Sequence, residues 1–207
     1  MNTTMQFWSW FKDNNKAYLF LHSVDNDVKE QLLDNFFQQL HQYCDNIYFE
    51  IGGNPDKDQE LIITAEGNEK YFDKVEELVN AAPQIVGWTF IAFKPSIPGH
   101  FKSQWGDLEL NTEDMWFVPL SNNNNSDLGI RVLLRNYDLI KESETLTPLL
   151  YKMLDTILGE KSFALNIAYV ETNLQPDDPE QEDGMYPILE LSEYIERHKS
   201  QTTQSSG

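Results

Sequence analysis

The chain has 207 residues, of which 40% are hydrophobic and 13% aromatic, so it can bury a substantial core and is too apolar to stay disordered. Fifteen Lys and Arg against thirty-four Asp and Glu give a formal net charge of −19, which repels nucleic-acid phosphates and anionic lipid. We therefore expect neither nucleic acid nor a membrane as a partner. The charge favours solubility or a surface that meets a basic protein.

The single cysteine, Cys44, excludes a disulfide within the chain and a zinc site built from several cysteines. It falls on the apolar side of a predicted helix, so we expect a buried structural thiol. The N-terminus lacks a signal-peptide pattern, and no apolar run is long enough to span a bilayer. These features predict a cytoplasmic protein.

The N-terminal segment predicts a short helix crowded with aromatic residues. Thr3 and Gln6 have the spacing of a capping box, and Trp8, Trp10 and Phe11 follow. The helix either docks on the core or exposes an aromatic patch that binds a partner. A second capping box, at Asp27 and Glu30, predicts a helix to about Cys44.

Residues 46–94 predict two strands, a helix and a third strand. An alternating strand at 46–51 turns back into the apolar run 61–65, a helix covers 69–82, and a strand follows at 86–93. A strand, a helix and a strand at this spacing form a right-handed crossover with parallel strands. The strand at 86–93 is apolar on both faces, which is typical of a central strand.

Residues 115–171 predict the same order of elements. A strand at 115–120 contains Pro119, which assigns it to a sheet edge or a bulge. A strand at 128–137, a helix at 147–158 ended by Gly159 and a strand at 161–171 complete the half.

The predicted fold class is α+β, with two consecutive ββαβ units forming mixed sheets covered by helices, after N-terminal helices. We expect a single domain over 1–199, with halves at about 46–94 and 115–171 and a C-terminal helix at about 187–198. The polar tail 200–207 is predicted to be disordered. Whether both halves share one sheet is left open by the pattern.

Catalytic and metal-binding motifs are missing from the sequence. The four histidines lie far apart, and no nucleophile elbow, phosphate-binding loop or dinucleotide-binding glycine motif occurs. The acidic run at 177–183 does not follow the ligand order of a calcium-binding loop. We therefore predict no catalytic residue, no metal and no cofactor.

A weak candidate site lies at the carboxyl ends of the two parallel strands, where ligands tend to gather in open sheets. Glu66, Asn68 and Lys94 end these strands, and His100 and Trp105 follow on the next loop. Together they could form a small polar pocket that receives an anionic group. The alternative is that Glu66 and Asn68 are turn and cap residues and that Lys94 is a solvated strand end.

Several motifs together resemble a known family. They are FWSWF at Phe7–Phe11, FEIGG at Phe49–Gly53, ELIITAEGN at Glu60–Asn68, AAP at Ala81–Pro83, GWTFIAFKP at Gly87–Pro95 and LGE at Leu158–Glu160. This set resembles a family of uncharacterised bacterial proteins that contain a domain of unknown function. The resemblance implies no catalytic residue.

The leading functional hypothesis is a non-enzymatic protein that binds a basic partner, in the manner of an immunity protein that neutralises a basic toxin. The partner surface would be the aromatic residues Trp8, Trp10 and Phe11. The alternative is a small-ligand-binding protein or a hydrolase that uses the edge near Glu66, Lys94 and His100. The sequence specifies no oligomeric state.

Overall fold

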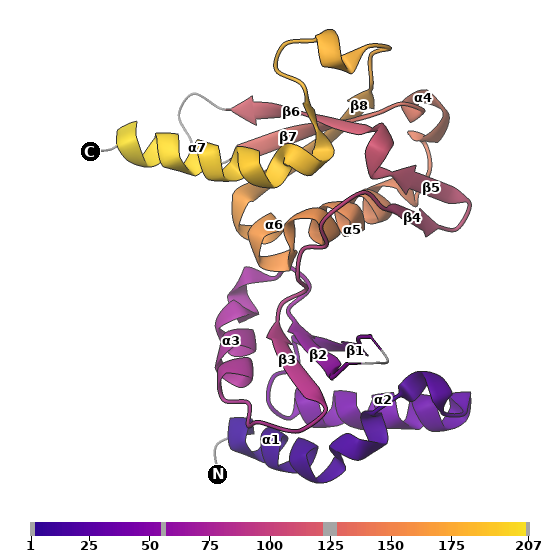
Figure 1. Cartoon of the computed structure of the whole chain (residues 1–207), viewed down its shortest axis with the longest axis vertical. Coiled ribbons are helices and arrows are strands. Elements are labelled where there is room, and N and C mark those ends of the chain that lie inside the picture. Colours follow the sequence, from indigo (N-terminus) through magenta and orange to yellow (C-terminus); the bar gives the residue numbers. More distant parts are fainter. Residues whose placement is uncertain (1–2, 55–56, 122–127, 206–207) are drawn as a thin grey trace. The chain divides into compact units, whose positions relative to one another are not determined.

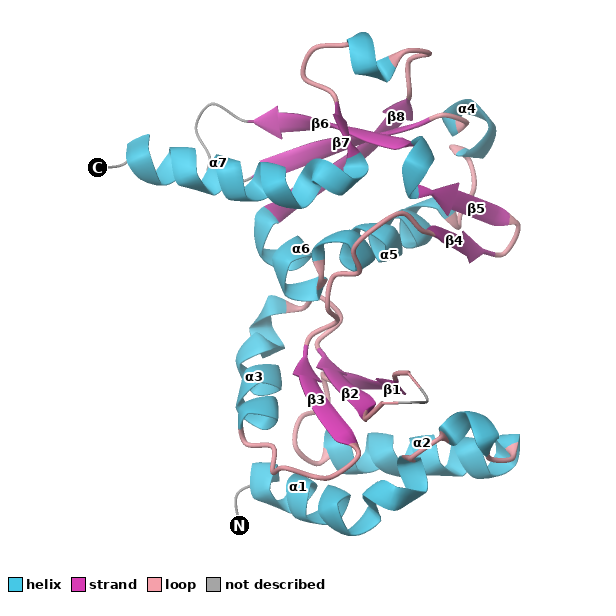
Figure 2. Ribbon diagram, in the orientation of Figure 1, coloured by secondary structure: helices cyan, strands magenta, loops and turns pink. Residues whose placement is uncertain are grey.

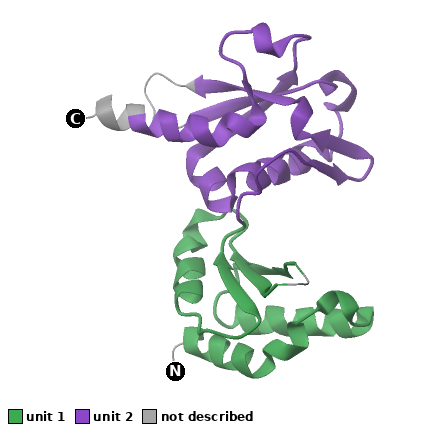
Figure 3. Cartoon of the chain, viewed as in Figure 1, with its two compact units in different colours: residues 1–94 green, residues 95–207 purple. Residues whose placement is uncertain are grey.

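The computed structural model describes residues 3–54, 57–121 and 128–205 (Figure 1). The chain divides into two compact units, Met1–Lys94 and Pro95–Gly207, where the sequence analysis expected one domain (Figure 3). The division falls at the end of the first predicted ββαβ half. The asparagine run at 122–125 lies outside the described residues.

Unit 1 is a three-stranded sheet with helices packed against it (Figure 2). The longer elements are α1 (Thr3–Asn14), α2 (Asn26–His41), β1 (Tyr48–Gly52), β2 (Gln59–Thr64), α3 (Phe72–Asn80) and β3 (Trp88–Ala92). Strand β2 lies between β1, which is antiparallel to it, and β3, which is parallel. The predicted hairpin and the predicted parallel crossover are both confirmed.

Aromatic side chains of α1 and α2 fill the space over one face of this sheet. Phe11 and Phe36 are fully buried, and their rings contact strand residues, with centroid distances of 5.0 Å from Phe11 to Trp88 and 4.1 Å from Phe36 to Phe49. Tight packing of rings at edge-on and tilted angles stabilises such a core beyond the area it buries. The N-terminal helix is therefore part of the core of unit 1.

Two predictions for unit 1 need correction. Strand β3 is an edge strand and β2 is the central one, although the segment 86–93 is apolar throughout. One side of β3 buries Trp88 against α1, while Val86 before it is 98% exposed, so large apolar side chains here do not mark a central position. Helix α2 begins at Asn26, because the Asp25 side chain accepts a hydrogen bond from the Asp27 amide and caps it.

Unit 2 contains a four-stranded sheet, a separate hairpin and several helices. The elements are β4 (Lys102–Trp105), β5 (Leu108–Asn111), β6 (Met115–Ser121), β7 (Leu128–Leu134), α4 (Tyr137–Ile140), α5 (Leu146–Leu158), α6 (Glu160–Asn166), β8 (Ile167–Leu174), the 3-10 helix η5 (Pro179–Gln181), β9 (Tyr186–Pro187), the 3-10 helix η6 (Ile188–Glu190) and α7 (Leu191–Ser205). The sheet order is β8-β7-β6-β9, with β6 and β7 antiparallel and β7 and β8 parallel. Strands β6, β7 and β8 repeat the arrangement of β1, β2 and β3, in a separate sheet.

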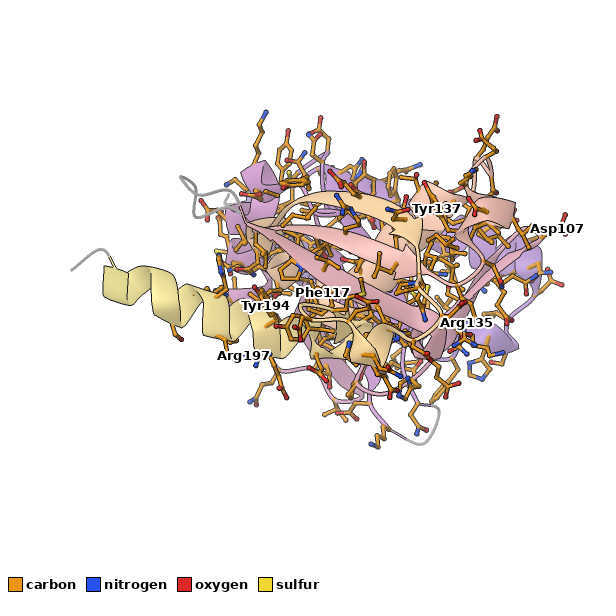
Figure 4. All side chains as sticks on the ribbon, turned by 90° about the horizontal axis from the view of Figure 1, so that it is seen from above. Asp107, Phe117, Arg135, Tyr137, Tyr194 and Arg197 are labelled. Atoms are coloured by element: carbon orange, nitrogen blue, oxygen red, sulfur yellow. The ribbon has the colours of Figure 1, made fainter. Side chains whose placement is uncertain are left out.

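The core of unit 2 lies between one face of this sheet and helices α5 and α7. Ile130 and Val132 of β7 and Met153 of α5 are completely buried there. Phe117 of β6 packs edge-on against Tyr194 of α7, with ring centroids 5.6 Å apart (Figure 4). Helix α7 is thereby fastened to the sheet by an aromatic contact.

Pro119 lies in β6 where the sequence predicted a sheet edge. Strand β9 pairs with β6 only at Trp116 and Phe117, so β6 has a single neighbour, β7, at Pro119. A proline without an amide donor is tolerated at such a position.

The second half departs from the prediction after Gly159. This residue ends α5 as predicted, with a positive φ of 79°, but the chain then forms α6 before β8 starts at Ile167. The alternation of bulky and small residues in 161–171 fits a strand, yet the Asn166 side chain donates to the Ser162 carbonyl within a helical turn. A local helix therefore replaces the first half of the predicted strand.

The C-terminal helix is also longer than predicted. Pro187 belongs to β9, and α7 starts at Leu191 and runs to Ser205, through most of the tail that was predicted to be disordered. The sequence from Leu191 to Ser205 contains neither Gly nor Pro, so nothing in it breaks the helix.

Candidate functional site

The turn after β2 holds two of the predicted ligand residues, Glu66 and Asn68. The Thr64 hydroxyl accepts a hydrogen bond from the Glu66 amide at 2.9 Å, and the Asn68 amide donates to the Ala65 carbonyl at 2.9 Å. The Asn68 side chain accepts from the Lys70 amide at 3.3 Å and caps the short helix that follows. Asn68 therefore has the structural role that the sequence analysis gave as the alternative.

Glu66 and Lys94 meet at the carboxyl ends of β2 and β3. The Lys94 ammonium nitrogen lies 2.9 Å from the Glu66 Oε2, with side-chain exposures of 22% and 53%. Both chain segments reach this contact through left-handed backbone, with φ of 50° at Glu66 and 67° at Phe93. The prediction that these strand ends gather polar residues agrees with this ion pair, in which the two opposite charges offset each other.

Phe93 holds the second strand end in place. Its amide donates to the Ile63 carbonyl at 2.8 Å, and its buried ring lies 4.7 Å from the ring of Phe72 in α3. A phenylalanine with positive φ is unfavourable by itself, so these two contacts must offset the strain. The result is a rigid support for Lys94.

The remaining two predicted ligand residues, His100 and Trp105, belong to unit 2. His100 Nδ1 lies 3.4 Å from the Thr112 hydroxyl, which also bonds the backbone of Phe101 and joins this loop to the end of β5. Trp105 ends β4 beside the hairpin turn and is 50% exposed. Of the five candidates, Glu66, Asn68 and Lys94 belong to unit 1, where Lys94 pairs with Glu66.

The predicted aromatic partner surface lies mostly inside unit 1. Trp8 is 4% exposed and Phe11 fully buried, and the Trp8 indole nitrogen donates to the Leu78 carbonyl at 2.8 Å. Trp10 is half-buried, with its ring 5.6 Å from that of Phe36. Trp8 and Phe11 are therefore core residues and not an exposed patch, because the sheet of unit 1 needs a large apolar cover.

One polar cluster was missed by the sequence analysis. The Tyr43 hydroxyl donates to the Lys74 carbonyl at 3.0 Å, the Lys74 ammonium binds Glu77 at 2.9 Å, and Thr4 donates to the other Glu77 oxygen at 3.3 Å. Burial raises the pKa of Tyr43 above its usual range, and the Glu77 carboxylate adds to this increase. The Lys74 hydrogen bond lowers the pKa of Glu77. The spacing of Lys74 and Glu77 on a predicted helix was the available signal.

The segment between β8 and β9 is acidic and ordered. Its start is held by the Gln175 amide, which donates to the Leu134 carbonyl at 3.1 Å, and Pro179 is buried at the start of η5. Five exposed carboxylates lie on it: Asp177, Asp178, Glu180, Glu182 and Asp183. In the sequence, nine Asp and Glu and no Lys or Arg lie between Lys161 and Arg197.

Among the described residues, no three His, Cys, Asp or Glu side chains are placed to hold a metal ion. Within the same part of the chain, no helix has both the length and the apolar character needed to cross a bilayer.

The chain was compared with known proteins in three ways. No protein-family model, no curated protein and no solved structure matches it.

Proposed function

We propose that the protein is a non-enzymatic binding protein whose partner is a basic protein. The observation that carries this proposal is the distribution of charge over both units. Unit 1 contains fifteen acidic and seven basic residues, and unit 2 contains nineteen and eight. The negative charge is therefore a property of both folded units and not of one acidic tail.

Ion pairs within the molecule leave the net charge unchanged, but they offset cations and carboxylates one for one and so raise the share of carboxylates among the unpaired charges. Lys94 binds Glu66, Lys74 binds Glu77, and Arg131 binds Glu171. Each pair engages one of the few Lys and Arg side chains, so the electrostatic field that an approaching protein meets is dominated by carboxylates. Such a field speeds association with a cationic partner and weakens as salt is added.

An immunity-like protein is the concrete form that we propose, with a basic toxin or enzyme as the partner. Binding of this kind requires no catalytic group on the acidic protein, because electrostatic complementarity gives rate and specificity. The proposed setting is the cytoplasm, where a lone thiol such as Cys44 stays reduced.

Affinity capture tests the proposal. The full chain is immobilised, exposed to a lysate of its own source cells at low salt, and eluted in salt steps, with an unrelated protein of similar net charge as the control. We expect the column to retain strongly basic proteins that the control does not retain. Their Kd should increase at least about tenfold between 50 and 300 mM salt. Retained proteins no more basic than the lysate as a whole would contradict the proposal.

The alternative function, ligand binding or hydrolysis at the edge of unit 1 where Glu66 and Lys94 meet, is favoured by one observation. Glu66 and Phe93 both have positive φ beside the ion pair, and backbone strain of this kind concentrates at functional sites. A panel of small carboxylates and phosphates is screened by thermal shift on the natural protein and on Glu66→Gln. A compound that raises the Tm of the first protein alone would support this alternative.

A further inference from the structure

One face of the unit 2 sheet points away from the helices. Side chains alternate along a strand, so the register between β6, β7 and β8 fixes which residues share this face. It carries three cross-strand rows: Trp116, Leu133 and Asn173; Val118, Arg131 and Glu171; Leu120, Gly129 and Tyr169. Helices α5, α6 and α7 lie on the opposite side (Figure 2).

The first row is covered by the acidic segment itself. That segment starts beside Leu134, where Gln175 is bonded, and ends in β9, where Pro187 pairs with Trp116. Leu133 is only 3% exposed although it is not part of the core between sheet and helices. Figure 2 shows η5 on this side of the sheet. The segment therefore crosses the sheet next to the first row and, within the described residues, leaves the side chains of the other two rows (the open rows) partly exposed.

The two open rows combine apolar side chains with one ion pair. Val118 and Leu120 are half-buried, and the Tyr169 ring is 43% exposed. The Arg131 guanidinium donates to Glu171 from Nε at 3.1 Å and from a terminal nitrogen at 2.9 Å, which offsets the charge in the middle row. The Arg131 and Glu171 side chains are thus held together before any partner binds, which lowers the entropic cost of ordering them on binding.

Charge decides which occupant fits this surface. The five carboxylates of residues 177–183 (the acidic border) lie on the segment that crosses the sheet beside the first row, and no Lys or Arg occurs in the sequence between Lys161 and Arg197. A second copy of the chain would bring the same net charge of −19 and be repelled. A segment with apolar anchors flanked by Lys or Arg would place its anchors on the open rows and its cations against the acidic border.

We propose that the open face formed by Val118, Leu120 and Tyr169, with its acidic border at 177–183, is the docking surface for a basic amphipathic segment of the partner. This inference rests on the proposed function and adds the location of the contact. It differs from the aromatic N-terminus, which the sequence analysis gave as a candidate partner surface, because Trp8 and Phe11 are buried.

The test uses a fluorescently labelled synthetic peptide of Lys, Leu and Trp, about four helical turns long, titrated into the full chain at low salt. Two variants probe the surface: Val118→Ser, and a triple change of the border, Glu180→Gln, Glu182→Gln and Asp183→Asn. Their matched controls lie in unit 1: Val86→Ser, whose side chain is 98% exposed, and the exposed acids in Asp13→Asn, Glu30→Gln and Asp34→Asn. Circular dichroism verifies the fold of each.

We expect each surface variant to weaken peptide binding about tenfold and each control less than about twofold. Equal weakening by the two triple variants, with no effect of Val118→Ser, would overturn the docking surface and leave the proposed function intact. Absence of peptide binding by the natural protein at low salt would count against both.

Discussion

The ring of Tyr169 in β8 lies directly over Gly129 in β7. A Cβ atom added at Gly129 would overlap carbons of that ring, and the Tyr169 hydroxyl extends further to the Leu120 carbonyl in β6 at 3.4 Å. One side chain thus spans three strands. Gly129 leaves room for the ring, because any other residue would place a Cβ atom in the space that the ring occupies.

Replacing Gly129 with alanine should force Tyr169 off the sheet. We expect a loss of about 1–2 kcal/mol in the free energy of unfolding, from overpacking and from lost cross-strand contact. The control is Gly52→Ala in β1, where an added Cβ meets nothing within 4 Å, so stability should stay unchanged or rise by up to about 1 kcal/mol. Urea unfolding of both proteins, and of Gly129→Ala with Tyr169→Ala, measures the coupling. Equal effects of the two glycine changes would show that the ring does not occupy this space.

Short-range patterns predicted much of the fold, since the two ββαβ units and the end of α5 at Gly159 follow from periodicity and turn chemistry. The position of β3 at a sheet edge does not follow from local patterns. Trp88 is buried against α1 by a long-range contact, which a local pattern does not contain. Helix α6 was missed for a different reason: the alternation at 161–171 is typical of a strand, whereas the helical turn contains a side-chain bond from Asn166 to the Ser162 carbonyl.

The candidate site was predicted only in part. The meeting of Glu66 and Lys94 follows from the parallel pairing of β2 and β3, which the sequence indicated. The open face of the unit 2 sheet requires the exact register of three strands, and a register cannot be read from a single chain segment.

The indole of Trp8 provides a specific test of the N-terminal helix. Trp8→Phe keeps most of the buried ring but removes the indole donor, while the Leu78 carbonyl still accepts from the Ala81 amide at 3.3 Å, so we expect a loss of about 0.5–1.5 kcal/mol in stability. Trp105→Phe, at a half-exposed position near the hairpin turn, should change stability by less than about 0.5 kcal/mol. Chemical denaturation measures both. A neutral Trp8→Phe would mean that α1 is not fastened to α3 by this bond.

Alkaline pH should destabilise the protein through its buried tyrosines. Burial raises the pKa values of Tyr18, Tyr43 and Tyr194 in the folded state, so the unfolded chain releases these protons first as the pH rises above about 10. The contribution of these tyrosines to stability should therefore be constant below that pH and fall above it. Unfolding by urea at pH 9 and pH 11, with absorbance at 295 nm to follow ionisation, measures the effect.

Tyr43→Phe is the matched variant for this pH dependence. It removes one proton that the folded state holds more tightly than the unfolded state, so the decrease in stability between pH 9 and pH 11 should be smaller than in the natural protein. Tyr151→Phe, at a 44% exposed position, should leave the decrease unchanged. An identical decrease in all three proteins would show that Tyr43 does not contribute.

The ion pair between Glu66 and Lys94 can be separated from the backbone strain beside it. A double-mutant cycle with Glu66→Gln and Lys94→Met measures the coupling, which for a pair with a half-exposed carboxylate should be about 0.2–1 kcal/mol and shrink with added salt.

Glu66→Gly removes the charge and also relieves the φ of 50°, so it should be more stable than Glu66→Gln by up to about 1 kcal/mol. If Glu66→Gly is instead the less stable of the two, the turn does not store strain at this residue. A coupling well above this range would show that the pair is more desolvated than its exposure indicates, which would strengthen the ligand-binding alternative for this edge.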